Sequence, residues 1–419
     1  MKWISLIVLF ALLAGLAAGA LVRGYAPQLT GAAEVIEAFG GLWLNTLRMT
    51  VVPLVVSLLI TGIGSVADAA KTGGLVGRAV ILFTVLLMFA AVYGIAATQG
   101  LLSLWPVDRT AAESFVGSVG AAAVDIREPP TFVSWLQGLA PANPVAAAAE
   151  NNILQLVVFS VFFGFAATQL APHLRERIVG FFRAVAEAMV VVVHWILLAG
   201  PIGVFGLSIG VGLRAGLGAA GTLAHYVAVV TAVTAGATLI AWVIAITWGR
   251  QPLGRFTAAA TPVWAIAAST QSSLASLPAM LQAALGGMRI PAHVADVTLP
   301  LAVAVFRFTS PVANLAVCFM IAHLYNVEPT LLQMASAVVV AYAVSIASVG
   351  LPGQVSFVAS IAPICLALGV PTDLLGILIA VEVIPDIFRT LGNTTADMAA
   401  TSILARDVPR EDVTRAESA

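Results

Sequence analysis

Long apolar runs recur along this chain and constrain its fold more than any other feature. Runs of about 20 or more mainly apolar residues, enough to cross the hydrocarbon core of a bilayer as a helix, lie near 3–24, 42–66, 79–103, 145–171, 180–212 and 222–248. Each run predicts a transmembrane helix. The composition agrees, because 60% of the residues are hydrophobic and only 9% are charged. The first run follows Met1 and Lys2, and its length favours a retained helix over a secretory signal.

Beyond Arg250, clusters of Ser, Gly and Pro interrupt the apolar pattern at 269–278 and at 345–353. The apolar segments beside each cluster are too short to span a bilayer, and a helix break cannot face lipid because its backbone groups need partners. Each cluster therefore predicts a re-entrant helical hairpin, followed by a spanning helix. The two units, 256–323 and 331–405, have similar length and order, which is typical of a transporter binding site between inverted repeats. Two loops between ordinary helices are the alternative.

The expected fold class is an all-α integral membrane protein with eight transmembrane helices and two re-entrant hairpins. In chain order the segments are helices 1 and 2 in 1–78, helix 3 in 79–103, an external loop in 104–143, helices 4 and 5 in 144–220, helix 6 in 221–250, hairpin 1 in 251–296, helix 7 in 297–325, hairpin 2 in 326–370, helix 8 in 371–407 and a cytoplasmic tail in 408–419.

Charge placement predicts the orientation of the chain in the membrane. Of the 19 Lys and Arg residues, Arg307 and Arg389 fall deep in predicted spans. Five more fall on the outer side, namely Arg23, Arg48, Arg109, Arg127 and Arg214. The remaining twelve of the 19 lie on the inner side, which is the bias expected when both termini are cytoplasmic. We therefore expect a multi-pass protein of the cell (inner) membrane with the lipid bilayer as a partner.

Several other classes of function have no support. A net charge of −1 without a basic stripe excludes a nucleic-acid partner. Cys318 and Cys365 lie in apolar runs and are expected to be buried thiols, so neither a disulfide framework nor a metal site is predicted. His194 and His225 are isolated on apolar helices, which favours packing or hydrogen-bonding roles over catalysis. An enzyme is therefore not expected.

A polar stripe runs along predicted helix 8, because its polar residues recur at helical spacing on one face: Glu382, Asp386, Arg389, Thr390, Asn393 and Asp397. An intramembrane charge is costly and must be paired or functional. The Arg389 guanidinium suits a carboxylate and the Asp386 carboxylate suits an ammonium group, so together they match an acidic amino acid. A ligand-free salt bridge between them is the structural alternative. Glu382 is a candidate proton carrier.

The hairpin tips are expected to complete this site. Helix ends at Ser272, Ser273 and Ser276, and at 350–353, would direct free backbone N–H groups and positive dipole ends toward an anionic group. Gly350 and Gly353 would also let the second tip bend and open as a gate. Close helix packing by small residues is the alternative explanation of both clusters.

Six segments, taken together, resemble a known family. They read LRMTVVPLVVSLLITGIGSV at 47–66, NPVAAAAENNILQLVVFSVFFGFA at 143–166, AGPIGVFGL at 199–207, SSLASLP at 272–278, SVGLPG at 348–353 and DIFRTLGNTTAD at 386–397. In this order they resemble the dicarboxylate/amino acid:cation symporter family of glutamate transporter homologues. The resemblance implies a homotrimer whose transport region (79–103, 221–250 and the hairpins with helices 7 and 8) moves like an elevator against a scaffold (1–78 and 144–220).

The resemblance also implies roles for individual residues. Arg389 would bind a side-chain carboxylate, Asp386 the amino group, and Thr390 and Asn393 the amino-acid head. Ser272, Ser273, Ser310, Gly350 and Leu351 would complete the substrate site. The positions of the family's cation site are Arg307, Asn393, Asp397, Ser345, Ile346 and Ser348. Members that carry C4-dicarboxylates usually lack the aspartate that matches Asp386, which favours an amino acid.

The chain departs from the family at the cation site. The family's Asn-Met-Asp-Gly-Thr motif reads Phe306, Arg307, Phe308, Thr309 and Ser310 here, and the hydroxyl pair expected near 88–91 is missing. We expect Arg307 to replace a bound cation by neutralising Asp397 or Asp386. Pairing with Asp386 would instead block the ammonium site, and a purely structural Arg307 is a further alternative.

The predicted function is secondary active transport of a glutamate- or aspartate-like amino acid, with sodium coupling reduced or lost. The alternatives are a proton-coupled or exchanging transporter of a C4-dicarboxylate or another carboxylate, and a non-transporting sensor or channel. No cofactor is expected, and the coupling ion is sodium, a proton or none.

Overall fold

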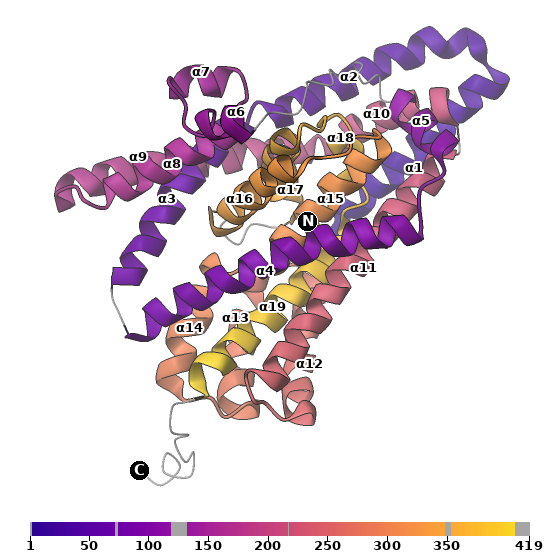
Figure 1. Cartoon of the computed structure of the whole chain (residues 1–419). Helices are drawn as coiled ribbons and strands as arrows, with labels where there is room; N and C mark the ends of the chain where they lie inside the picture. Colours follow the sequence, from indigo (N-terminus) through magenta and orange to yellow (C-terminus); the bar gives the residue numbers. More distant parts are fainter. Residues whose placement is uncertain (1, 72–73, 119–131, 217, 348–352, 407–419) are drawn as a thin grey trace.

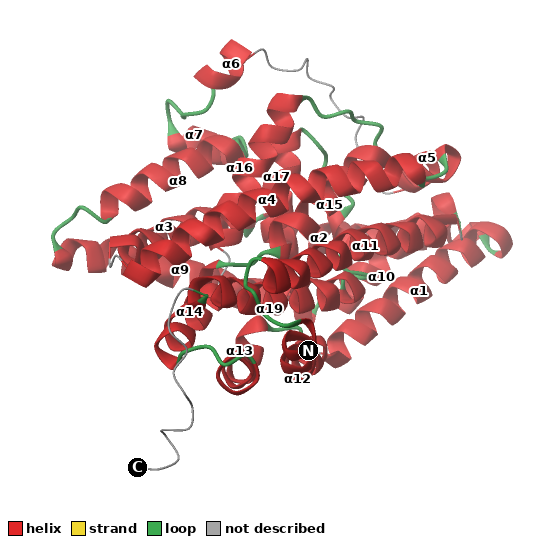
Figure 2. Ribbon diagram, turned by 60° about the horizontal axis from the view of Figure 1, so that its bottom comes forward, coloured by secondary structure: helices red, strands yellow, loops and turns green. Residues whose placement is uncertain are grey.

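The computed structural model describes residues 2–71, 74–118, 132–216, 218–347 and 353–406. Within these ranges the chain forms helices and no β-strand, as Figure 2 shows. Six helical stretches there are long and apolar enough to cross a membrane, and shorter apolar helices lie between and after them. The prediction of an all-α membrane fold is confirmed.

The N-terminal half of the chain forms helices up to α10. Their bounds are α1 Lys2–Tyr25, the 3₁₀ turn η1 Pro27–Leu29, α2 Thr30–Arg48, α3 Val51–Lys71, α4 Gly74–Leu104, α5 Arg109–Ser118, α6 Phe132–Gln137, α7 Pro144–Ala149, α8 Ile153–Ala167, α9 Pro172–Leu198 and α10 Gly200–Ala215.

The C-terminal half begins with a long helix and ends with the helix that carries the polar stripe. Its elements are α11 Gly218–Thr247, α12 Leu253–Thr270, α13 Ser273–Gln282, the π-helical turn η2 Ala283–Gly287, α14 Ala292–Val305, α15 Thr309–Leu324, α16 Leu331–Ala347, α17 Gly353–Leu368, α18 Leu375–Leu378 and α19 Val383–Ala405.

Several expected spans are divided in the structure. The run 180–212 is not one helix, because α9 ends at Leu198 and Pro201 lies in the first turn of α10. Proline lacks the N–H that would continue a helix but is well placed to begin one. The run 145–171 divides into α7 and α8 at Asn151, which has a left-handed backbone with φ 56°.

Two further expectations about helix limits differ from the structure. The helix expected over 42–66 starts earlier, at Thr30, and breaks between Arg48 and Val51. The predicted external loop, 104–143, contains α5 and α6, and Phe115 of α5 is fully buried. The element α5 packs against α10 and α11, so Arg109–Ser118 is a helix held by contacts with other helices and not a loop.

Predicted helix 7, 297–325, is also interrupted, at 306–308 between α14 and α15. This break lies beside α19, which packs against α4, α11, α12, α13, α14 and α15. In Figure 1 the yellow α19 lies among the labels of α11 to α14, with α4 passing in front. The helix with the polar stripe is therefore enclosed by protein.

Close backbone contacts at glycines hold two sets of helices together. In one set, a Cβ atom on Gly206 of α10 would lie 2.7 Å from the backbone oxygen of Ile36 in α2, and one on Gly212 would lie 2.3 Å from the backbone oxygen of Leu16 in α1. In the other set, a Cβ atom on Gly392 of α19 would lie 2.3 Å from the Thr309 side chain of α15. Any larger side chain at these positions would separate the helices.

Candidate functional site

The polar stripe of α19 faces the protein interior along its whole length. Glu382 and Asp397 have no exposed surface, and the other four residues are at most 4% exposed: Asp386, Arg389, Thr390 and Asn393. Buried charges persist only when they are paired, hydrogen-bonded or functional. The arrangement of these six side chains is therefore the centre of the candidate site.

Arg389 forms an ion pair with Glu382. The Arg389 Nη2 atom lies 2.9 Å from Glu382 Oε1, and the two side chains are 2% and 0% exposed. The second carboxylate oxygen of Glu382 accepts a hydrogen bond of 3.0 Å from the Tyr226 hydroxyl of α11. Both oxygens of Glu382 are thus engaged, whereas Nε of Arg389 has no partner within the described residues. One edge of the guanidinium remains able to donate to another carboxylate.

Asn393 ties α19 to the break in predicted helix 7. Its Oδ1 atom accepts a hydrogen bond of 2.9 Å from the backbone N–H of Thr309, at the first residue of α15. The Thr309 hydroxyl lies 2.8 Å from the same Oδ1 atom and donates a 2.6 Å bond to the backbone oxygen of Arg389. A helix start has backbone N–H groups that need acceptors, and Asn393 supplies one from another helix. This contact holds Arg389 in register with α15.

Arg307 lies in the same break and is 8% exposed. The charges of Arg389, Asp386 and Asp397 all act on its guanidinium. Both carboxylate oxygens of Asp397 are buried without a hydrogen-bond partner among the described residues, and so is Nε of Arg307. The negative charge of Asp397 therefore interacts with the positive charge of Arg307 through space, without a hydrogen bond between them.

The first hairpin tip reaches the N-terminal end of α19. Gln271 joins α12 to α13 with a left-handed backbone, φ 53°, and its Nε2 atom donates a 3.1 Å bond to the backbone oxygen of Val383. Ser272 caps α13 by accepting a bond from the N–H of Ala275, and Ser272 and Ser273 are both partly buried. The structure therefore places these predicted site residues close to the Glu382 end of the stripe.

The second tip is only partly described. Gly350, Leu351 and Ser348, together with the rest of 348–352, lie outside the described residues. Ser345 is fully buried at the end of α16 and donates a bond of 2.6 Å to the backbone oxygen of Ala341. Ile346 is partly buried beside it. Ser310 is 4% exposed, one residue after Thr309.

Comparison with known proteins identifies the family of this chain. A family model described as the sodium:dicarboxylate symporter family matches residues 4–407. The chain belongs to this family. Its members are transporters, so this symporter-family protein is a multi-pass membrane transporter and not an enzyme.

Relatives of the symporter-family protein carry several transport activities in their names. The proton/glutamate-aspartate symporter of Escherichia coli K12 is 25% identical over 95% of this chain and 91% of its own length. The human neutral amino acid transporter B(0) is 27% identical over 97% of this chain and 80% of its own length. The proton/sodium-glutamate symport protein of Geobacillus stearothermophilus is 25% identical over 95% and 93%.

Aromatic side chains fill the region where the family's motif has polar ones. Phe306 and Phe308 are each 1% exposed, and their ring centroids are 6.0 Å apart. Phe306 also stacks on Phe83 of α4, with centroids 4.6 Å apart and planes 12° apart. Such a cluster contributes apolar and stacking energy but has no oxygen atoms for a cation. The symporter-family protein therefore differs from the motif in packing as well as in charge.

The third helix also lacks the expected hydroxyl pair in the structure. Along 88–91, Met88 and Phe89 are exposed, while Ala90 and Ala91 are fully buried. The residue of α4 that contacts the altered motif is instead Phe83. Phe83 could not be predicted from the sequence, because its contact depends on which face of α4 packs against Phe306, a residue far away in the chain.

Two other residues of the site were missed from the sequence. Tyr226, which bonds to Glu382, lies on α11 and is fully buried. Trp264 of α12 donates a 2.9 Å bond from Nε1 to the hydroxyl of Thr395 on α19. A buried Tyr or Trp needs a polar partner, but sequence spacing does not say which distant helix supplies it.

The remaining histidines and cysteines singled out from the sequence lie outside the polar row. Nε2 of His225 lies 3.0 Å from the backbone oxygen of Trp105, whose ring it meets edge to face, and His194 is exposed on α9. Cys318 and Cys365 are buried free thiols, as predicted. Within the part of the chain that the structure describes, no group of three or more His, Cys, Asp or Glu residues is arranged to hold a metal ion.

Proposed function

We propose that this protein is a secondary active transporter of an acidic amino acid, glutamate- or aspartate-like, in which sodium coupling is reduced or lost. The observation that carries the proposal is the buried row in which Arg389 and Asp386 lie one turn apart on α19. Arg389 has a guanidinium edge available for a side-chain carboxylate, and Asp386 offers a carboxylate for an ammonium group. The names of the relatives from E. coli and G. stearothermophilus agree with this substrate class.

The loss of sodium coupling rests on what replaces the cation site. Arg307 supplies a permanent positive charge near Asp397, and Phe306 and Phe308 supply no oxygen ligands. In this proposal Asn393, Asp397, Ser345, Ile346 and Ser348 no longer complete a cation cage. Asn393 is already engaged by Thr309, which agrees with a structural role for its carbonyl oxygen.

A proton is the coupling ion that the Glu382–Arg389 pair favours. A substrate carboxylate that binds Arg389 must share the guanidinium with Glu382 or displace it. Protonation of Glu382 removes its negative charge and so weakens its hold on Arg389. The described charged or titratable groups that act on Glu382 are Arg389 and Asp386 on its own helix and Tyr226 from α11. A dicarboxylate or other carboxylate substrate is the alternative cargo for the same proton-linked exchange.

We further propose the arrangement that the family resemblance implies. Helices α4 and α11 to α19 would form the mobile transport region, α1 to α3 and α7 to α10 the scaffold, and three copies would associate through scaffold helices. Exposed apolar side chains on α9, such as Phe181 and Trp195, agree with a surface that meets lipid or another copy. The protein would lie in the inner membrane with both termini in the cytoplasm.

Uptake into liposomes tests the proposal directly. Purified protein is reconstituted, and entry of labelled glutamate or aspartate is measured with an inward proton gradient, an inward sodium gradient, or neither. We expect the proton gradient to drive uptake and the sodium gradient to add little. Accumulation driven by sodium as strongly as by protons would refute the loss of sodium coupling.

Counterflow separates a transporter from a sensor or a channel. Liposomes loaded with unlabelled substrate should take up labelled substrate transiently, because exchange through one alternating site links the two fluxes. Arg389→Ala should abolish this exchange. A flux that does not saturate, or an absence of counterflow with all acidic amino acids and C4-dicarboxylates, would favour the channel or sensor alternative.

A further inference from the structure

A pocket of about 270 Å³ lies beyond the Asp397 end of the polar row, where α11 ends, α14 begins and α19 ends. Its floor is made of buried residues, namely Gly249, Gln251, Ile290, Pro291, Ser402 and Ala405. Its rim consists of three exposed arginines, Arg250, Arg289 and Arg406. No acidic residue is among the described residues that line it. The pocket thus combines a closed base with a ring of positive charge.

Two of these arginines occupy the same unusual position in matching turns. Arg250 follows α11 and Arg289 follows the turn η2, with left-handed backbones of φ 51° and 56°. The next residue donates its N–H six residues back in both turns, from Gln251 to Ala245 at 3.1 Å and from Ile290 to Ala284 at 2.9 Å. Glycine is usual at this position, because the left-handed backbone is unfavourable for a residue with a side chain. In both turns, an unfavourable backbone conformation thus places an arginine at the pocket.

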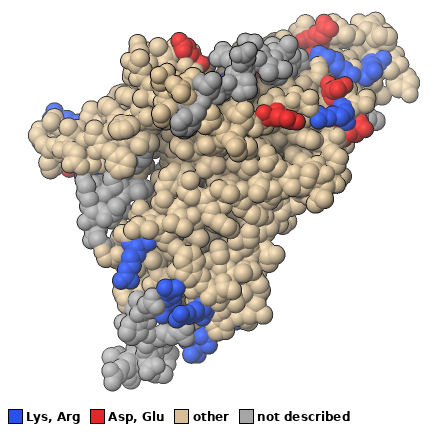
Figure 3. Space-filling model, viewed as in Figure 1, with Lys and Arg blue, Asp and Glu red and all other residues tan. Residues whose placement is uncertain are grey.

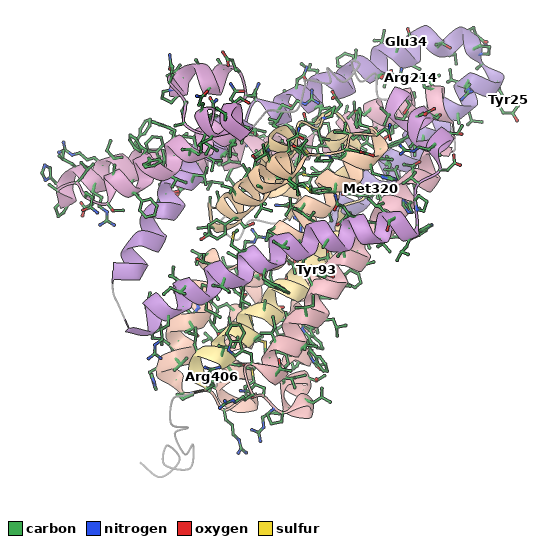
Figure 4. The ribbon with its side chains drawn as sticks, viewed as in Figure 1. Tyr25, Glu34, Tyr93, Arg214, Met320 and Arg406 are labelled. Atoms are coloured by element: carbon green, nitrogen blue, oxygen red, sulfur yellow. The ribbon has the colours of Figure 1, made fainter. Side chains whose placement is uncertain are left out.

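Two of the three arginines at the rim, Arg250 and Arg289, have no compensating partner among the described residues. Among the described residues, the side chains of Arg250 and Arg289 take part in no ion pair or hydrogen bond. Like charges that converge on one cavity repel each other unless an anion lies between them. Figure 3 shows described charges of only one sign, blue, at the lower end of the molecule, where Figure 4 labels Arg406. The pocket therefore suits an anionic group.

The side chain of Gln251 indicates that a ligand of this pocket also donates a hydrogen bond. Its side chain is 5% exposed and lines the pocket, and its Oε1 atom is buried with no hydrogen-bond partner among the described residues. An unsatisfied buried amide oxygen costs free energy that a bound donor recovers. A ligand that offers both a negative group and a hydroxyl would satisfy the arginines and this oxygen together.

We propose that this pocket binds a phosphate group that carries a neighbouring hydroxyl, presented by an anionic phospholipid headgroup or by a soluble phosphate compound. Arginine guanidinium groups bind phosphate oxygens through paired, charge-assisted hydrogen bonds. The site is separate from the proposed substrate site, and it does not depend on which substrate or coupling ion the transporter uses. A bound phosphate would join the turn before α12 to the end of α19.

Thermal unfolding in nanodiscs tests the site and separates the two sources. The full chain is placed in phosphatidylcholine discs, in discs that also contain phosphatidylglycerol, and in phosphatidylcholine discs titrated with inorganic phosphate at constant ionic strength. The variants are the double change Arg250→Gln with Arg289→Gln, and Arg255→Gln as the matched control. Arg255 lies on α12 close in sequence to Arg250 but does not line the pocket.

We expect phosphatidylglycerol or phosphate to raise the unfolding temperature of the unmodified protein and of Arg255→Gln. The double variant should bind the same additive more weakly, by on the order of tenfold or more, because two charge-assisted contacts are lost. A response to phosphatidylglycerol alone would identify the lipid, and a response to phosphate alone would identify a soluble ligand. The proposal is overturned if neither additive stabilises the protein, or if the double variant responds as strongly as the control. If the double variant does not fold, Gln251→Leu replaces it in the same comparison.

Discussion

If Arg307 takes the place of a cation, as proposed, replacing it by methionine should produce a protein that sodium stabilises. Arg307 is 8% exposed and Asp397 is not exposed, and no hydrogen bond joins them. Two unit charges 4 Å apart attract by about 4 kcal/mol at an effective dielectric constant of about 20. Arg307 and Asp397 form no ion pair within 4.0 Å, so their attraction is smaller, and we expect a loss of about 2–3 kcal/mol.

Sodium should recover part of this loss, because the methionine variant leaves Asp397 as an uncompensated buried carboxylate. A ligand that binds only the folded state stabilises it by about 2.7 kcal/mol at one hundred times its dissociation constant. Thermal unfolding of the purified variant is measured over a range of sodium concentrations, with choline holding the ionic strength constant. The unfolding temperature of the variant should rise with the logarithm of the sodium concentration, while that of the unmodified protein should stay constant.

Two matched variants make this test specific. Arg307→Lys keeps the positive charge and should remain insensitive to sodium. Adding Asp397→Asn to Arg307→Met removes the carboxylate and should abolish the sodium response. If the unmodified protein is stabilised by sodium as much as the methionine variant is, Arg307 does not take the place of a cation and the reasoning fails.

Three further predictions follow from the contacts of α15 and α19. Glu382→Gln keeps one side-chain oxygen that can accept from Arg389 but cannot bind or release a proton, so uptake should lose its dependence on pH while counterflow persists. A pH profile equal to that of the unmodified protein would exclude Glu382 as the proton carrier. Thr309→Val removes a hydroxyl that forms hydrogen bonds within the buried site and should lower the free energy of unfolding by about 1–3 kcal/mol. The control Thr247→Val, at an exposed residue, should change the free energy of unfolding little. Equal changes in the two variants would contradict the role of Thr309. Mild oxidation should join Cys318 and Cys365 in a disulfide, because their sulfur atoms lie 3.3 Å apart. Mass spectrometry of the digested protein detects the linked peptides, and their absence after oxidation would contradict the contact between α15 and α17.

The polar row was predictable because it depends on spacing within one helix. Side chains three, four, seven and eleven residues after Asp386 share a face of any α-helix, and the cost of charge in lipid predicts that this face is buried. The structure confirms the burial of Arg389 and Asp397. The pairing of Arg389 with Glu382 was not predictable in the same way, since Glu382 and Asp386 lie on the same face and Tyr226, which bonds to Glu382, belongs to the distant α11.

The helix breaks show a similar limit. The break at 199–201 has a Gly-Pro signal that a search for apolar runs passes over, because Gly200 and Pro201 lie among apolar residues. The break at 306–308 contains no Gly or Pro. The backbone N–H of Thr309, at the start of α15, donates a hydrogen bond to Asn393 of another helix. Pro311 in the first turn of α15 is a local signal for a helix start, but the hydrogen bond from Asn393 is a tertiary contact that leaves no signal near the break.

The close contacts at Gly392 and Gly206 prevent the helices that meet there from sliding along each other. At Gly392 the backbone of α19 lies directly against Thr309 of α15, and at Gly206 the backbone of α10 lies directly against α2. A displacement of one helix along its partner would bring larger side chains into either contact and create a clash. In any conformational change, α19 and α15 are therefore expected to move together, and so are α2 and α10.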